Sequence, residues 1–272
     1  MRLLARPAVL IALAVCLLHN TNSTMAGGLA SNEHFVVLAT DQALADAVLA
    51  KATALGQQLS RDWLGKPLPS NLIRRPCIHA TLSDSEDQGT TWIDLANGRQ
   101  YGMVWVTSSR ERLLGSTLAH EVCHLVLAYG CQGEGELPAW ATEGAASLQD
   151  NRELVEIRER TLRSFAQNDR WPSLYSILEK PSIGVTDHSS YCIATSLTEY
   201  LLSCGDKSRV VRFALAGKQK GWDQAVVEHY KLQNVQELQN AWQTWANRRV
   251  RTAERETPIR SDLSTGTTKR RS

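Results

Sequence analysis

The sequence predicts an α+β protein in which a small mixed sheet precedes a helical C-terminal lobe. Short apolar runs bounded by turn residues, typical of strands, occur only before residue 107. Apolar residues at helical spacing dominate after residue 109. With 272 residues, 43% of them hydrophobic, the chain is long enough to bury one large core or two small ones.

The first part of the chain predicts a strand followed by a long helix. Residues 35–38 form a short apolar run, and residues 41–63 carry apolar side chains on one helical face. That face consists of Leu44, Val48, Ala52, Leu55, Leu59 and Trp63. The Gly and Pro residues within 65–69 end the helix.

Three further strands are predicted at residues 77–82, 91–95 and 101–106. Asn97-Gly98 separates the last two and favours a tight hairpin turn. We expect the strand at 101–106 to form a sheet edge, where an extended peptide can add as a further strand. Its alternating Tyr101, Met103 and Trp105 can equally be interpreted as core residues.

A helix is predicted at residues 109–129, with Ser108 and Glu111 as a capping box at its start and Gly130 at its end. One face of this helix is apolar, and His120 and His124 lie on nearly the opposite face. The apolar face comprises Leu114, Leu118, Val122 and Leu125. The helix is therefore expected to be buried at its back and to line a cleft at its front.

The segment from His120 to His124 has the pattern HExxH, which places two imidazoles one helical turn apart, within reach of one metal ion. Glu121 lies beside the pair and is positioned to accept a proton from a water that the metal activates. Glu143 follows in a Trp-Ala-Thr-Glu-Gly context, and the intervening residues allow a loop and a second helix to return it as third ligand. Three protein ligands leave the fourth position of a tetrahedral zinc open, as catalytic sites require. The pattern predicts one zinc ion per chain.

The rest of the chain is predicted to be helical. The helix that carries Glu143 begins near Pro138, a favoured residue in a first turn. Further helices are expected at residues 152–167, 172–179, 190–203, 207–217, 222–231 and 235–247. We therefore expect an N-terminal α/β lobe at 27–136 and a helical lobe at 137–247, with the cleft between them.

The two ends of the chain differ from its middle. Residues 1–26 combine Arg2 and Arg6, an apolar stretch too short to span a bilayer, and small residues near Ala26, a composition typical of a signal peptide. This predicts an exported protein, either secreted or periplasmic. Residues 248–272 hold eight basic and three acidic side chains and no periodic apolar positions, which predicts a disordered tail. The tail is either simply solvated or a contact for an acidic surface. Nothing else indicates nucleic-acid recognition, and no later segment predicts a transmembrane span.

The cysteines give a less definite expectation. Six are present, and removal of a signal peptide with Cys16 leaves five, so at least one thiol stays unpaired. Cys77 with Cys131 is the pairing we expect if a disulfide forms. Cys192 and Cys204 belong near opposite ends of one helix, too far apart to bond.

The zinc motif and its surroundings resemble the gluzincin metallopeptidases. HExxH, an 18-residue gap and a glutamate followed by Gly match the spacing of aminopeptidase-like members. The fuller run from 110 to 146 is similar to small secreted bacterial peptidase-MA-like proteins, and the likeness extends loosely over 35–245. The resemblance implies a zincin-like fold. It also implies that Tyr191, at the head of the helix after the third ligand, donates a hydrogen bond to the oxyanion; His188 is the alternative donor.

This chain departs from that family in two places. The Gly-Ala-Met-Glu-Asn loop that binds a free peptide amine in true aminopeptidases is absent. Ser147 occupies the position where thermolysin-like members have an aspartate that orients a ligand histidine. A partner for His120 or His124 must therefore come from elsewhere, since ligating imidazoles usually need one.

These observations predict an exported zinc metallopeptidase that acts on peptide or protein substrates, with Glu121 as general base. Two alternatives stay open. One is a non-catalytic cell-envelope binding protein with a structural or vestigial zinc; the other is an amidase that acts on cell-wall peptides. The intact Glu121 favours the enzymes, because a purely structural zinc needs no general base beside it.

Overall fold

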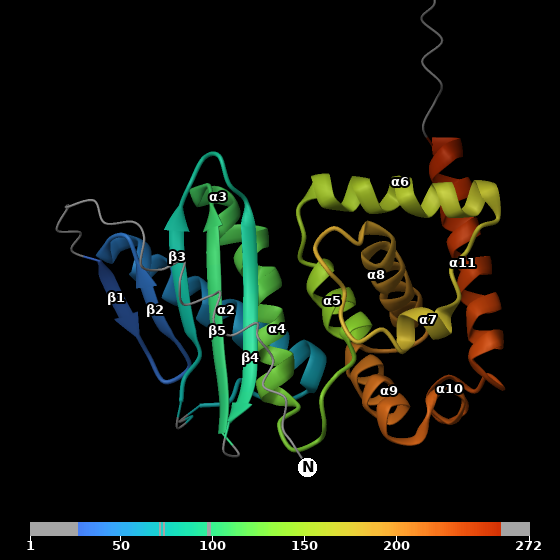
Figure 1. Cartoon of the computed structure of the whole chain (residues 1–272), viewed down its shortest axis with the longest axis horizontal. Coiled ribbons are helices and arrows are strands. Elements are labelled where there is room, and N and C mark those ends of the chain that lie inside the picture. Colours follow the sequence, from blue (N-terminus) through green and yellow to red (C-terminus); the bar gives the residue numbers. More distant parts are fainter. Residues whose placement is uncertain (1–26, 71, 73, 97–98, 257–272) are drawn as a thin grey trace, which may run out of the picture.

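The computed structural model describes residues 27–70, 72, 74–96 and 99–256. Over these residues the protein has the predicted mixed α+β architecture, with a five-stranded sheet in the N-terminal half and helices in the C-terminal half (Figure 1). The predicted signal peptide, the hairpin turn at 97–98 and the end of the chain from 257 lie outside the described residues.

The sheet has the order β1-β2-β3-β5-β4. Its strands are β1 (Gly28–Ser31), β2 (Val36–Ala39), β3 (Cys77–Leu82), β4 (Gln88–Ala96) and β5 (Arg99–Ser108). The pairs β2–β3 and β3–β5 are parallel and the other two pairs are antiparallel, so the sheet is mixed. The short strand β1 was not predicted from the sequence.

The sheet order corrects the expected position of the edge strand. The strand at 101–106 belongs to β5, which pairs with β3 on one side and β4 on the other, so the prediction that it forms the edge is wrong. The hairpin pattern predicted the pairing of the two strands but not which of them lies outside. Val104 and Val106 of β5 are buried, as suits an interior strand, and the edge is β4, which carries Thr and Asp residues.

Side chains of β5 alternate between the two faces of the sheet. Val104 and Val106 point to the inner face and are almost fully buried. Tyr101, Met103 and Trp105 point to the outer face, where Trp105 is 41% exposed. The interpretation of these three as core residues is therefore wrong.

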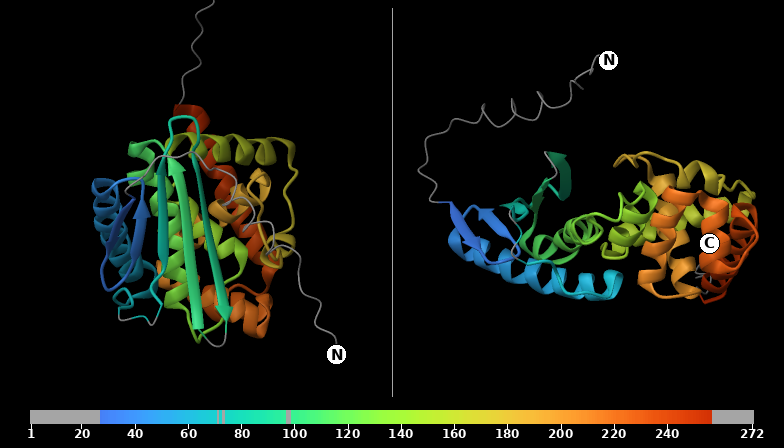
Figure 2. Two further views of the ribbon diagram at one scale, coloured as in Figure 1. Left: turned by 60° about the vertical axis from the view of Figure 1, so that its left-hand side comes forward. Right: turned by 90° about the horizontal axis from the view of Figure 1, so that it is seen from below.

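Helices α2 (Gln42–Leu64) and α4 (Leu118–Gly130) cover the inner face (Figure 2). The Asp41 side chain caps α2 by accepting a hydrogen bond from the Leu44 amide at 2.8 Å. Gly65 ends the helix with φ of 65°, a conformation that favours glycine. The predicted apolar face of α2 is buried against the sheet, with Leu44, Val48, Ala52, Leu59 and Trp63 no more than 2% exposed.

The start of the HExxH helix differs from the prediction. A short helix α3 (Arg110–Arg112) leads into a π-helical turn at Leu113–Thr117, and Ser109, not Ser108, is the N-cap residue. The Ser108 hydroxyl donates to Asp87 instead, at 2.6 Å, so the predicted capping box does not form. Because a π turn holds an extra residue, the helix phase shifts there, and Leu113 rather than Leu114 is fully buried.

The helical lobe follows the predicted series closely. It comprises α5 (Ala139–Ser147), α6 (Arg152–Asn168), α7 (Leu174–Leu178), α8 (His188–Ser203), α9 (Lys207–Lys220), α10 (Trp222–Tyr230) and α11 (Val235–Glu256). Helix α11 includes the first nine residues of the predicted tail, 248–256. Ala246 and Val250 extend its buried face and pack in a cluster with Leu162 of α6, which explains the extension.

One hydrophobic core connects the two lobes. The cluster that contains Val37 and Val104 of the sheet also contains Trp140, Phe213 and Trp222 of the helical lobe. The Trp140 ring lies 5.9 Å from Phe213 and 6.1 Å from Trp222 between centroids, in tilted and edge-on arrangements. These ring contacts lie within the helical lobe; between the lobes, α4 packs against α5 and α2 packs against α9.

The expected disulfide does not form. Cys77, Cys123, Cys131, Cys192 and Cys204 all carry free thiols. Cys77 alternates with buried Ile78 on β3 and therefore points to the outer face of the sheet. Cys131 caps the end of α4 on the inner side, so the sheet itself separates the two sulfurs.

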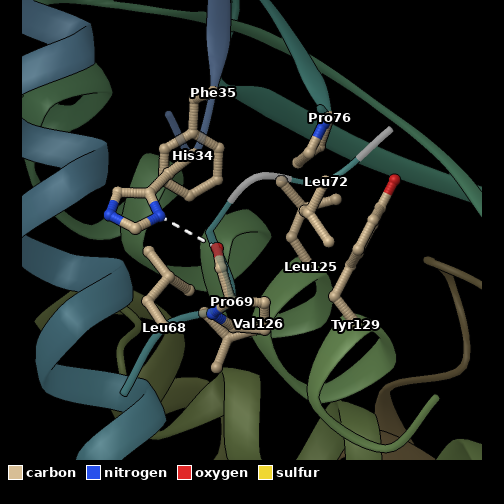
Figure 3. Close-up of a pocket in the computed structure, with 9 residues that line it drawn as sticks. All are labelled: His34, Phe35, Leu68, Pro69, Leu72, Pro76, Leu125, Val126 and Tyr129. Atoms are coloured by element: carbon tan, nitrogen blue, oxygen red, sulfur yellow. Dashed lines mark hydrogen bonds between the residues drawn. The ribbon is translucent and has the colours of Figure 1, made fainter. Parts of the chain in front are cut away.

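A small cavity lies behind α4 (Figure 3). Its volume is about 10 Å³, room for about one water molecule. It is lined by His34, Phe35, Leu68, Pro69, Leu72, Pro76, Leu125, Val126 and Tyr129. The His34 ring faces the Pro69 carbonyl at 2.9 Å, so this histidine serves to tie the loop after α2 to the core.

Candidate metal centre and cleft

A cleft of about 1020 Å³ lies between the edge of the sheet and the helical lobe, where the sequence predicted one. Strand β4, helix α4, the loop before α5, helix α5 itself and the segment before α8 all contribute to its walls. Its lining includes His120, Glu121, His124, Glu143 and Tyr191. The cleft therefore gathers residues from both lobes around one point.

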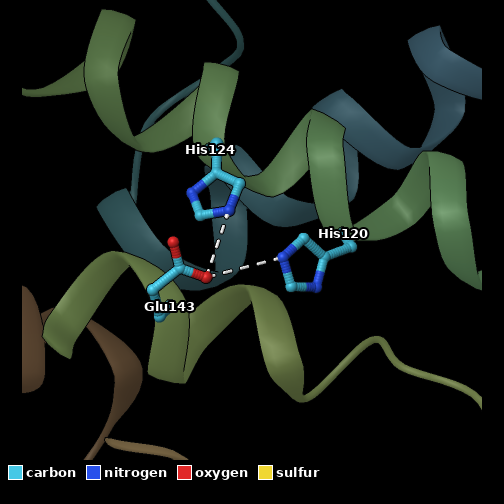
Figure 4. Close-up of side chains that lie close together, drawn as sticks. All are labelled: His120, His124 and Glu143. Atoms are coloured by element: carbon cyan, nitrogen blue, oxygen red, sulfur yellow. Dashed lines mark ion pairs between the residues drawn. The ribbon is translucent and has the colours of Figure 1, made fainter. Parts of the chain in front are cut away.

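Helix α4 and helix α5 bring three potential metal ligands together (Figure 4). His120 and His124 lie one turn apart on α4, with ring centroids 5.0 Å apart. The Glu143 Oε2 atom lies 3.7 Å from the Nε2 atom of each histidine. The three ligand atoms all lie within 4.8 Å of one another, so this group can hold a metal ion.

The geometry and the burial of Glu143 both fit a metal. Two ligand atoms bound to one tetrahedral zinc are about 3.4 Å apart, close to the observed separations. At 3.7 Å the histidine nitrogens are too far away for hydrogen bonds, and Glu143 Oε2 is buried without a hydrogen-bond partner. A cation at the centre of the group would provide this buried carboxylate oxygen with the partner that it lacks.

The two histidines have different electrostatic surroundings in the protein without metal. Burial acts to lower the pKa of His120, but the hydrogen bond to Asp150 and the carboxylate of Glu143 outweigh it and raise the pKa to about 10. Burial lowers the pKa of His124 to about 4. A metal ion at this position must displace the proton from His120, so metal binding and protonation compete there.

Asp150 supplies the partner for a ligand histidine. Its Oδ1 atom accepts a hydrogen bond from Nδ1 of His120 at 2.8 Å, which leaves Nε2 free to face the metal position. Its Oδ2 atom accepts from the guanidinium of Arg158, at 2.9 Å from one nitrogen and at a shorter contact from another. The sequence predicted a partner other than Ser147 but did not single out Asp150. Asp150 lies just after α5, three residues further along, where the chain leaves the helix and passes His120.

Glu121 lies outside the ligand group and is held from β4. Its side chain is buried, and the Thr91 hydroxyl donates to Oε2 at 2.5 Å. Burial raises the pKa of Glu121 above the usual carboxylate range, while His120 and the Thr91 hydrogen bond oppose that shift. Neighbouring Gly89 makes room for this carboxylate, because a Cβ atom there would lie 2.4 Å from Oε1. Nothing in the sequence distinguished Gly89 or Thr91.

The glycine after the third ligand allows two helices to approach closely. A Cβ atom at Gly144 would lie 2.2 Å from Oγ1 of Thr198 and 2.6 Å from the Ala194 carbonyl oxygen, both on α8. Since α8 also carries Tyr191, this approach places the tyrosine beside Glu143 on the neighbouring helix. In the Glu143-Gly144 pair, Glu143 is therefore the candidate ligand, and Gly144 allows α5 to pack closely against α8.

The two predicted oxyanion donors occupy different positions. Tyr191 is half-buried and lines the cleft; burial and then the charge of Glu143 raise the pKa of its phenol, so it stays protonated. His188, at the first turn of α8, is exposed and is not among the residues that line the cleft. The structure thus brings Tyr191, but not His188, to the ligand group.

Comparisons with known proteins assign no family to this chain: no protein-family model, no curated protein and no solved structure matches it.

Proposed function

We propose that the protein is a zinc metallopeptidase of the gluzincin type, exported from a bacterial cell, with His120, His124 and Glu143 as metal ligands. The main support for the proposal is that one cleft holds both a group of potential metal ligands and, separate from it, a candidate general base. Three ligand atoms converge on one point, and a fourth group, Glu121, is buried beside them without joining them. A structural zinc site would use its fourth position for another protein ligand.

Each residue has a defined task in peptide hydrolysis. Zinc, when bound, lowers the pKa of a water toward about 7 and polarises the substrate carbonyl. Glu121 accepts the proton of the attacking water and returns it to the leaving amine. The phenol of Tyr191 donates a hydrogen bond to the oxygen that becomes negative in the transition state. Asp150 keeps His120 in the tautomer that presents Nε2 to the metal.

The position of β4 supports a polymeric, extended substrate. Within the described sheet β4 pairs only with β5, and Gly89, Thr90, Thr91, Ile93 and Asp94 line the cleft. A peptide that adds to this edge as a strand would be held by backbone hydrogen bonds largely independent of its sequence. The HExxH helix lies directly behind the same strand, because Thr91 contacts Glu121. This arrangement would present successive peptide bonds to the metal centre.

A zincin-like fold is part of this proposal. Its support is the mixed sheet with an antiparallel edge strand beside the HExxH helix, and a helical lobe that returns the third ligand. Export is proposed from residues 1–26 alone. Among the described residues, no helix has the length and apolarity to cross a membrane.

The test is metal analysis combined with digestion of a peptide library by the wild type and Glu121→Gln. We expect about one zinc per chain in both proteins. We expect peptide cleavage by the wild type and a rate at least about a hundredfold lower in the variant, because glutamine cannot accept the proton. Equal cleavage by both would remove Glu121 as the base, and bound zinc without any cleavage would favour the non-catalytic binding protein.

A further inference from the structure

A second group of side chains of the types that can bind metal lies on the outer face of the sheet, away from the cleft. Strands β3 and β5 are parallel neighbours, and Cys77 pairs with Met103 while His79 pairs with Trp105. Ile78, between Cys77 and His79 on β3, and Val104, between Met103 and Trp105 on β5, are buried against the helices. Because side chains alternate along a strand, all four of these residues share the outer face.

The distance between the thiol and the imidazole fits a shared ion. The Sγ atom of Cys77 lies 3.6 Å from Nε2 of His79. Sulfur at about 2.3 Å and nitrogen at about 2.0 Å from one metal, with an angle of about 110° between them, are separated by about the same amount. The existing side-chain positions therefore need little rearrangement to bind.

Two neighbours complete this arrangement. Met103 is the register partner of Cys77 on a strand about 4.8 Å away, so its flexible thioether can reach the same point. The Trp105 ring stacks on His79 with centroids 5.9 Å apart and an interplanar angle of 17°, which fixes the plane of the imidazole.

The chemistry of the donors selects the metal. A thiol, an imidazole and a thioether form a soft set without a carboxylate, and such a set favours Cu(I) over Mg²⁺, Ca²⁺ or Mn²⁺. The surroundings are apolar, since Trp92 and Trp105 flank Met103 and His79 in the sheet register. Both indoles are partly exposed, at 46% and 41%, so an ion has access from solvent, and an indole face attracts a cation.

We propose that Cys77, His79 and Met103 form a binding site for one Cu(I) ion on the outer face of the sheet. Binding replaces the thiol proton of Cys77 by a copper–sulfur bond, releases that proton to solvent and leaves the oxidation state of copper unchanged. The site is independent of the HExxH centre, because the sheet and its Ile78 layer separate the two.

The test is anaerobic titration of the reduced full chain with Cu(I) in competition with the chelator bicinchoninate. We expect one tightly held Cu(I) per chain and quenching of tryptophan fluorescence as it binds. Cys77→Ser should lower the affinity by on the order of a hundredfold, and Met103→Leu, which keeps the side-chain volume, by about tenfold. Cys204→Ser is the control, because it removes an exposed thiol of the helical lobe, away from the sheet, and should leave the affinity unchanged.

A variant with both His120→Ala and His124→Ala distinguishes the two centres. If it keeps the Cu(I) affinity of the wild type, the copper lies outside the HExxH cleft, as proposed. Loss of Cu(I) binding in this double variant, or wild-type affinity in Cys77→Ser, would overturn the proposal. Thermal unfolding of each variant confirms that it is folded.

Discussion

The two lobes contribute different kinds of group to the candidate metal centre. The N-terminal lobe supplies both histidines and Glu121, all from one turn of α4. The helical lobe supplies Glu143 from α5 and Asp150 from the segment that follows it. The first set is arranged by the local geometry of a single helix, whereas the second reaches the centre only because the lobes pack together.

The two sets of residues therefore differ in what holds them in position. Histidines four residues apart keep their spacing in any intact helix. Glu143 keeps its position only while α5 packs against α4 and α8, an approach that Gly144 permits. We therefore expect a metal ion to act as a link between the lobes, and loss of a ligand from either lobe to remove that link.

The largest expected effect is on metal occupancy. His124→Ala in the N-terminal lobe and Glu143→Ala in the helical lobe should each abolish stoichiometric zinc and, with it, peptide hydrolysis, because two protein ligands hold zinc weakly. Elemental analysis after dialysis measures the occupancy. Since metal binding stabilises the folded state, wild-type protein should also melt at a lower temperature after chelation, and both variants should lack that difference. Full zinc in either variant would contradict the ligand assignment.

The next effect separates Tyr191 from His188. Tyr191→Phe removes one hydroxyl from the cleft and keeps the ring, so folding and zinc content should stay unchanged. Because the hydrogen bond forms mainly in the transition state, kcat should fall by about a hundredfold with little change in KM. His188→Ala changes a side chain on the same helix that is exposed and outside the cleft lining, and its kcat should be close to that of the wild type. The reverse result would transfer the oxyanion role to His188.

The smallest expected effect concerns Asp150, which contacts His120 and would influence the metal only through that histidine. Asp150→Asn keeps the shape of the side chain but weakens the hydrogen bond to Nδ1, and zinc affinity should fall by about 10- to 100-fold. Competition with a chelator measures the change. Glu153→Gln is a matched control, because its carboxylate also pairs with an arginine, Arg112, but lies at the surface. Equal zinc affinities in wild type and Asp150→Asn would show that Asp150 does not orient His120 for metal binding.

The residues on α4 and the class of fold were accessible from the sequence. Helical periodicity alone places His120 and His124 on one face, and the apolar spacing of residues 41–63 predicted the long helix that covers the sheet. These predictions succeed because they rest on contacts between residues a few positions apart. The spacing from His124 to Glu143 was informative for the same reason, since a helix–loop–helix limits where the chain can return.

Other features were decided only by the tertiary structure. The sequence paired β4 with β5 correctly but assigned the edge to the wrong strand, because the choice depends on the distant strand β3. The sequence predicted that the partner of a ligand histidine comes from a position other than Ser147 but did not identify it; it is Asp150, whose position depends on how the chain leaves α5. The expected Cys77–Cys131 bond fails because a sheet lies between the sulfurs.

Local periodicity and spacing were enough to predict the helix that carries HExxH, the three candidate ligands and the α+β class. The folded structure was needed to establish which strand borders the cleft, how Thr91 and Asp150 hold Glu121 and His120, and which side chains share the outer face of the sheet. These contacts join residues that are far apart in the chain. Thr91 and Asp150 each lie 30 positions from the residue they hold, and the outer-face side chains lie on separate strands. Such contacts form only when whole elements pack together, and no local pattern specifies them.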